Sequence, residues 1–159
     1  MSLTDEHFRA LGRITVDFST LEFVLAGLLA ELIAPDRAIG QILASQLSFS
    51  KLVTAVGALF LHRASDGPDT QRLADILKRA AEAEFKRNTA IHSAYLITAG
   101  APTDIVTRVK VKTKREKGLS HDAQDMTPTD LNQIADEINS VVKDLARFIG
   151  DISTAQPRS

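Results

Sequence analysis

The stretch that decides the fold is residues 5–33, DEHFRALGRITVDFSTLEFVLAGLLAELI. Its large apolar side chains recur every three or four positions, the spacing that places side chains on one face of an α-helix. They are Phe8, Leu11, Phe18, Leu21, Leu25, Leu28 and Leu32. Such a helix would span about 43 Å, more than a compact monomer of this size usually encloses. The pattern therefore predicts a long amphipathic helix and hints at a partner along its length.

One carboxylate interrupts this apolar face. Glu22 lies about 40° from Phe18 and about 60° from Leu25 around the helix axis. A carboxylate inside an apolar stripe needs a cationic partner such as Arg87, or it takes up a proton. The alternative is that the stripe is narrower and that Glu22 lies at its edge.

Prolines divide the rest of the chain into further helical segments. Helical spacing predicts a short helix near residues 37–46, a third helix over 49–62 and a fourth over 69–97. The sequence Thr127-Pro128-Thr129-Asp130 is typical of a helix start, with a capping threonine, a proline at the first helical position and an acidic residue in the first turn. This final helix is expected to end near Ile149, with Gly150 as its stop and residues 151–159 as a loose tail.

Composition favours one soluble globular domain, residues 1–150. The chain has 159 residues, 44% hydrophobic and 25% charged, which suits one sizeable core. Its net charge of -1 gives no overall attraction to nucleic acid, so any such attraction must come from a local patch. The absence of cysteine excludes disulfides and cysteine-based metal sites. No apolar stretch is long enough to span a bilayer, and we expect a cytoplasmic protein with no membrane partner.

A basic segment before the final helix changes the pattern from period 3.6 to period 2. The alternating cations are Arg108, Lys110, Lys112 and Lys114. This alternation predicts a short β-strand, or a hairpin that turns at Gly118 and returns through residues 121–126. Its basic face suits the phosphates of RNA. The alternative is a solvated edge strand that lysines protect from aggregation.

Chemistry concentrates in the segment RNTAIH, residues 87–92, on the predicted fourth helix. Arg87 supplies a fixed cation, Asn88 an orienting amide and His92 a proton shuttle near neutral pH. These groups are suited to handling a phosphodiester. The helix face that carries these groups changes from apolar to polar at Glu84. The second half of this face is therefore either exposed to solvent or lines a polar groove.

Helix geometry limits how these groups can cooperate. In a continuous helix Arg87 and His92 lie about 140° apart around the axis and about 7.5 Å apart along it, so they do not meet directly. Asn88 shares a face with His92 and is placed to bond its imidazole. Glu84 either forms a simple side-chain pair with Arg87 or Asn88, or it positions the site residues without touching RNA. Tyr95 either contacts RNA or packs in the core.

The spacing of Arg87, Asn88 and His92 resembles the Arg-x4-6-His signature of the HEPN family, in which the residue after the arginine is commonly Asn, Asp or His. The resemblance is specific only over residues 87–92. It implies an all-α helical bundle, a metal-independent ribonuclease activity without cofactors, and an active centre at a homodimer interface. It also implies toxin–antitoxin or phage-defence settings, with an antitoxin protein as partner. One HEPN subgroup has a tyrosine two residues after the histidine, whereas here that position is Ala94.

Other familiar chemistries lack their motifs. The sequence has no glycine-rich phosphate loop, no zinc-binding H-E-x-x-H pair and no G-x-S-x-G elbow. His7, His62 and His121 lack ligand spacing, and we expect them on the surface. The combined expectation is an antiparallel bundle of about five helices, with a short basic strand or hairpin before the last helix. It would cleave RNA as a homodimer with Arg87, Asn88 and His92 as catalytic residues; the alternative is a non-catalytic dimer that binds nucleotides, RNA or protein.

Overall fold

The computed structural model describes residues 3–33, 36–64, 66–97, 100, 102–114 and 118–155, apart from the side chains of residues 112–114 and 155. Within these ranges the chain forms five helices and one three-stranded sheet. In chain order the elements are α1 (Asp5–Ile33), α2 (Arg37–Ala44), α3 (Phe49–Ala64), α4 (Pro68–Ile91), β1 (Ala94–Leu96), β2 (Val106–Lys114), β3 (Gly118–Met126) and α5 (Pro128–Ala155). The predicted mainly helical fold is confirmed.

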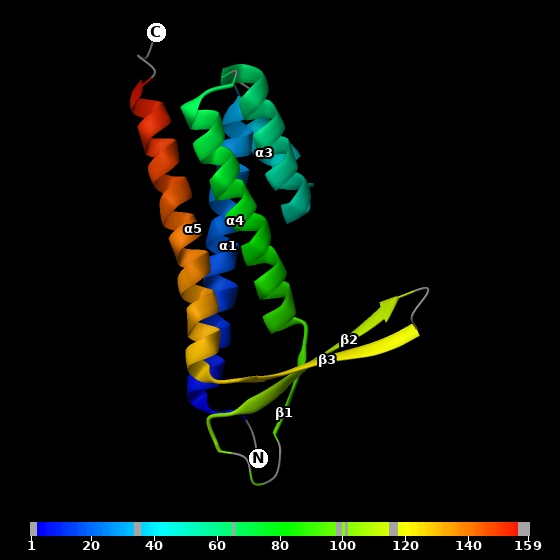
Figure 1. Cartoon of the computed structure of the whole chain (residues 1–159). Helices are drawn as coiled ribbons and strands as arrows, with labels where there is room; N and C mark the ends of the chain where they lie inside the picture. Colours follow the sequence, from blue (N-terminus) through cyan, green and yellow to red (C-terminus); the bar gives the residue numbers. More distant parts are fainter. Residues whose placement is uncertain are drawn as a thin grey trace.

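The helices pack around α1. Each of the other four helices contacts α1, and α1, α4 and α5 run side by side over much of their length (Figure 1). α3 has 16 residues against 29 in α1, so it accompanies only part of the bundle. The sheet lies at the end of the bundle where α4 ends and α5 begins. No helix in the described ranges combines the length and the hydropathy needed to cross a membrane.

The buried face of α1 differs from the predicted one at its N-terminal end. His7, Ala10 and Ile14 are buried there, whereas Phe8 is 56% exposed. The expectation that His7 lies on the surface is therefore wrong; its Nδ1 lies 2.7 Å from the Thr4 hydroxyl. Steps of three and four residues back from Phe18 pass through positions 14, 10 and 7, so helical phase decided burial here and side-chain size did not.

Two helices end elsewhere than predicted. α4 ends at Ile91, six residues before the predicted end, and the chain then turns into β1. α5 continues through Gly150 to Ala155, so the predicted stop and the loose tail are wrong for residues 151–155. This extension is held by Ile152, which packs against the core, and by Asp151, which pairs with Arg72 at 2.7 Å. Residues 156–159 lie outside the described part of the chain.

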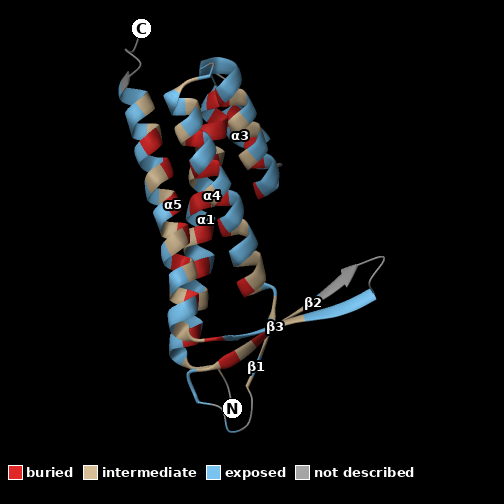
Figure 2. Cartoon of the chain, viewed as in Figure 1, coloured by how far each residue is buried: buried red, intermediate tan, exposed pale blue. Residues whose placement is uncertain are grey.

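The hairpin predicted before the last helix is confirmed. β2 pairs antiparallel with β3, from Val106 opposite Met126 to Lys114 opposite Gly118. β1, which was not predicted, pairs with the other edge of β2. The β2–β3 hairpin projects away from the helices, and its buried residues lie at the end that joins the bundle (Figure 2).

The predicted start of α5 is also confirmed. The Thr127 amide and hydroxyl both donate to the Asp130 carboxylate, at 2.8 and 2.7 Å. In return, the Asp130 amide donates to the Thr127 hydroxyl at 3.2 Å. These reciprocal bonds form a capping box, and the bonds from Thr127 lower the pKa of Asp130.

Candidate functional site

The motif residues meet where α4 ends. His92 is the C-cap of α4, with φ -101° and ψ 36°, so its side chain leaves the helical path. The imidazole Nε2 lies 3.4 Å from Nη1 of Arg87. The expectation that Arg87 and His92 do not meet is therefore wrong, because it assumed a helix that continues past residue 92.

Asn88 contacts the arginine. Its Oδ1 accepts a hydrogen bond from Arg87 Nη1 at 2.8 Å. Its link to His92 runs through the backbone, where the His92 amide donates to the Asn88 carbonyl at 3.3 Å. The structure thus differs from the predicted side-chain pair between Asn88 and His92. Asn88 orients the guanidinium, and the guanidinium faces the imidazole.

Arg87 is held on its other side by an aromatic ring. The centre of its guanidinium lies 5.0 Å from the ring centroid of Phe18 in α1, within the range of a cation–π contact. The Phe18 ring in turn lies 4.7 Å from that of Phe49, at the start of α3. The Nε atom of Arg87 is buried and has no hydrogen-bond partner among the described residues. The cation is thus half-buried and keeps donor capacity.

The two predicted supporting carboxylates do not bond to Arg87. Glu22 and Glu84 are both half-buried. Within the described residues, neither forms an ion pair or hydrogen bond with Arg87 or Asn88. Partial burial of Glu22 agrees with the alternative in which it lies at the edge of the α1 stripe. The supporting roles of both glutamates stay predictions.

The residues after His92 cap the helix with their side chains. The Ser93 hydroxyl donates to the Thr89 carbonyl at 2.6 Å, and the Tyr95 hydroxyl donates to the Ala90 carbonyl at 2.9 Å. Both bonds satisfy carbonyl groups that the end of a helix leaves without partners. Burial raises the pKa of Tyr95, and the positive charge of Arg108 opposes that shift. Tyr95 is therefore engaged in structure, with its hydroxyl turned toward α4.

Two cations of β2 reach this helix end in different ways. Lys110 Nζ donates to the Asn88 carbonyl at 3.1 Å, which places its charge at the negative end of the α4 dipole. Arg108 is only 3% exposed. Its guanidinium lies 3.4 Å from Ser93 Oγ, from Gln124 Oε1 and from Asp122 Oδ1.

The predicted basic face of the strand is thus divided. Arg108 is directed into the junction between α4 and the sheet, so the structure contradicts its expected display toward solvent. Arg108 lies opposite Tyr95 of β1 and Gln124 of β3, so side chains of both neighbouring strands flank it. Lys110 lies beside the motif, as an RNA-binding role requires. The side chains of Lys112 and Lys114 lie outside the described residues.

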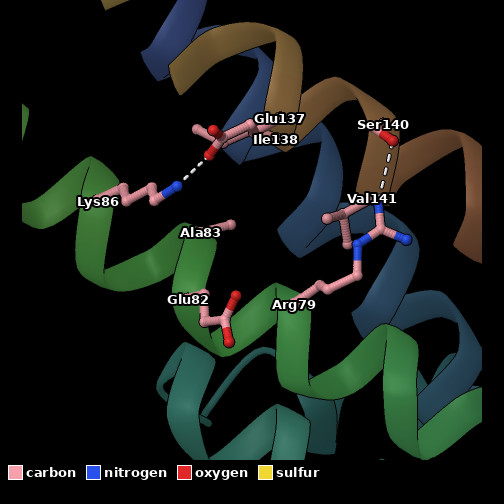
Figure 3. A pocket seen from close by; sticks show the side chains of 8 residues that line it. All are labelled: Arg79, Glu82, Ala83, Lys86, Glu137, Ile138, Ser140 and Val141. Carbon is pink, nitrogen blue, oxygen red and sulfur yellow. Dashed lines mark hydrogen bonds and ion pairs between the residues drawn. The ribbon is translucent and has the colours of Figure 1, made fainter. Parts of the chain in front are cut away.

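A cavity of about 240 Å³ lies between α4 and α5, away from this site. Its lining includes Arg79 and Lys86 of α4, which reach across to Ser140 and Glu137 of α5 (Figure 3). Arg87 and His92 do not line it. The cavity is part of the helix packing seam, and the motif opens directly at the surface.

The geometry brings three cationic or proton-carrying groups to one helix end: Arg87, His92 and Lys110. An exposed imidazole beside a half-buried guanidinium can exchange protons while the guanidinium binds an anion. No cluster of three or more side chains suited to hold a metal ion occurs among the described residues.

Sequence reasoning missed the contributions of Phe18 and Ser93. Phe18 was assigned to the core alone, and nothing in the spacing indicates that it lies beside Arg87. Ser93 lies in a segment that was predicted as helix. A usable signal was the short alternation of polar and apolar residues from Ser93 to Leu96, followed soon by Gly100 and Pro102.

Comparison with known proteins gives no further support. No protein-family model matches the chain, and no curated protein and no solved structure matches it. The likeness to the HEPN family therefore depends on residues 87–92 and on their helical setting.

Proposed function

We propose that the protein is a metal-independent endoribonuclease of the HEPN type that acts as a homodimer. The observation that carries this proposal is the 3.4 Å approach of Arg87 Nη1 to His92 Nε2, beside the ammonium group of Lys110. A phosphate between the guanidinium and the ammonium would lie within reach of a group that accepts and donates protons.

The reaction would follow from the roles of three side chains. His92 accepts the proton of the ribose 2′-hydroxyl, and the 2′-oxygen then attacks the adjacent phosphorus. The bond from phosphorus to the 5′-oxygen breaks, and the leaving oxygen takes up a proton from water while His92 releases its proton to the solvent. Arg87 stabilises the negative charge that builds up on the phosphate, and Asn88 keeps the guanidinium in place. The products are a 2′,3′-cyclic phosphate and a 5′-hydroxyl.

The proposed setting follows the same resemblance. The substrate is RNA in the cytoplasm, the activity belongs to a toxin or a defence system, and an antitoxin protein holds it in check. Lys110 binds the RNA backbone next to the scissile phosphate, and no metal or cofactor takes part.

A second candidate is a non-catalytic module that binds a nucleotide or RNA. It is favoured by the environment of His92, whose ring contacts Arg87 and has no acidic partner among the described residues. A carboxylate or carbonyl partner usually fixes the tautomer of a catalytic imidazole. In this module Arg87 and Lys110 would hold the phosphate without cleavage.

Incubation of the purified protein with RNA in EDTA tests the proposal. The variants are Arg87→Ala and His92→Ala, and the matched controls are Arg63→Ala and His62→Ala, which lie exposed on α3. We expect cleavage by wild type and controls, with cyclic phosphate ends, and a loss of at least about 100-fold in each motif variant. RNA binding without cleavage by the wild type would support the module, and cleavage that persists in His92→Ala would refute the mechanism.

A further inference from the structure

Although α1 is the central helix of the bundle, its outer face, opposite its core face, is exposed at Gly12, Val16, Ser19, Thr20 and Phe23. Val16 is 64% exposed and Phe23 is 75% exposed. Both lie on the side of α1 opposite its core face, which carries Ile14, Phe18 and Leu25. These two large apolar side chains lie two turns apart on the same exposed face, so they offer an apolar contact surface to a partner helix.

The pattern on this face is the same when read from either end. Val16 follows Gly12 by four residues, and Gly27 follows Phe23 by four residues. Nothing lies within 4 Å of the position that a Cβ atom would occupy at either glycine, and Gly27 lines an open groove that α2 also lines. Ser19 and Thr20 form the centre of the pattern. A surface of this kind can meet a copy of itself in antiparallel orientation.

Charges at the two ends of the face add to this self-complementarity. Arg9 lies near the N-terminal end and Glu31 near the C-terminal end, and both are exposed. Neither Arg9 nor Glu31 forms an ion pair within the described residues. Arg37 and Arg63 lie near Glu31, because each lines a cavity that Glu31 also lines. In an antiparallel pair of α1 helices the arginine of each copy would lie beside the glutamate of the other, at both ends.

We infer that the outer face of α1 binds a second copy of this chain about a two-fold axis near Ser19 and Thr20. Val16 of each copy packs against the partner's Phe23, and Arg9 pairs with the partner's Glu31. Helix packing of this kind extends over about 33 Å of α1. A groove of about 400 Å³ beside Phe23, between α1 and α2, offers room for side chains of the second copy.

This inference names the surface of the homodimer in the proposed function and does not depend on ribonuclease activity. Arg87 lies over Phe18, on the core face of α1 and away from this surface. The two Arg87–His92 sites therefore lie on the outer flanks of the α1 pair, and each copy would act through its own site.

Charge reversal tests the antiparallel orientation. Arg9→Glu and Glu31→Arg should each weaken the dimer by about tenfold or more, because like charges then meet at both ends. The double variant restores opposite charges and should return the dissociation constant to near the wild-type value. Sedimentation equilibrium over a range of concentrations measures it. A monomeric wild type, or a double variant as weak as the single ones, would overturn the inference.

Phenylalanine replacement and cross-linking test the position of the face. Phe23→Glu should yield a monomer, while Phe85→Glu on α4, where Phe85 is 68% exposed, should remain a dimer.

Since the chain has no cysteine, Thr20→Cys introduces a single thiol near the axis, with Ala146→Cys on α5 as control. A short bismaleimide should link Thr20→Cys into a dimer and leave the control monomeric; the reverse result would rule out this face.

The same samples separate this inference from the proposed activity. A monomer that cleaves RNA would overturn the α1 surface and leave the ribonuclease standing. A dimer linked through Thr20→Cys that cleaves no RNA would support the surface and refute the activity.

Discussion

At the scale of single residues, Arg87 is positioned by three kinds of contact. The Asn88 side chain accepts a hydrogen bond from Arg87, and the guanidinium makes a cation–π contact with the Phe18 ring. The imidazole of His92 lies 3.4 Å from Arg87 Nη1. A guanidinium fixed in this way loses less conformational entropy when it binds a phosphate than a free side chain does. In the proposed function, the phosphate would therefore meet a guanidinium that is already in place.

Tyr95→Phe tests the hydroxyl that closes this helix end. The variant keeps the ring and loses the bond to the Ala90 carbonyl, so we expect the free energy of unfolding to fall by about 0.5–1.5 kcal/mol. Urea denaturation at neutral pH measures the change. An unchanged unfolding free energy would show that the bond contributes nothing to stability.

The same residue predicts a loss of stability in alkali. Because burial raises the pKa of Tyr95 above its ordinary value of 10.0, the folded state favours the neutral phenol. Its contribution to stability is complete below 10.0 and is lost as the pH rises through the higher pKa of the folded state. Tyr95→Phe cannot ionise, so its stability should fall less steeply in this range than that of the wild type.

At the scale of elements, one position shows how closely two helices pack, and another shows how a helix start is capped. α2 crosses α1 so closely at Gly40 that a Cβ atom there would lie 2.5 Å from the Ala30 carbonyl oxygen. α5 begins with the reciprocal bonds of Thr127 and Asp130. At Gly40 the close packing of α2 on α1 leaves no room for a side chain. At the start of α5 two residues of the local sequence, Thr127 and Asp130, form the hydrogen bonds of the cap.

Gly40→Ala should destabilise the fold by about 1–3 kcal/mol, because backbone atoms of α1 must move to admit the methyl group. Gly150→Ala is the matched control, since it lies within α5 and nothing is within 4 Å of its added Cβ. Alanine is the better helix former, so the control should gain about 0.5–1 kcal/mol. Thermal unfolding of both variants measures these changes. A destabilised Gly150→Ala would contradict the helical assignment of α5 past residue 149.

Thr127→Ala should lower the free energy of unfolding by about 0.5–2 kcal/mol through loss of the cap. The pKa of Asp130 is lowered by its bonds from Thr127, so the stability it provides is present above its ordinary value of 3.8 and is lost as the pH falls through the lower folded value. Denaturation between pH 6 and about pH 2 should therefore show a smaller acid-induced loss in Thr127→Ala than in the wild type. Parallel curves would contradict the capping role.

At the scale of the whole molecule, charge is local. The net charge is -1, yet Arg87, His92 and Lys110 gather at one helix end. In the proposed function, long-range attraction of RNA to such a molecule is weak, and binding would depend on short-range contacts with phosphates.

Lys110→Ala should weaken RNA binding and reduce the slope of log affinity against log salt by about 0.7, the value for one phosphate contact on a single strand. Lys143→Ala, exposed on α5, should leave the slope unchanged. Fluorescence anisotropy with a labelled RNA at several salt concentrations measures both. Equal slopes in the two variants would remove Lys110 from the RNA-binding surface.

The sequence by itself determined the features that depend on neighbouring residues. Helical periodicity from Asp5 to Ile33, the alternating strand around Arg108 and the capping box at Thr127 each record a local hydrogen-bonding pattern. For this reason the helices, the hairpin and the start of α5 could be predicted, as could the segment that bears the candidate site.

Only the tertiary structure decided where α4 and α5 end and which site residues meet. β1 pairs with β2 and draws the chain out of the helix after Ile91, which turns His92 toward Arg87. Arg108 is buried among side chains of β3 and of the segment after α4, and contacts with the core and with Arg72 carry α5 past Gly150. Each of these outcomes depends on residues far apart in the chain, whose contacts outweigh the weak local preferences at a helix end.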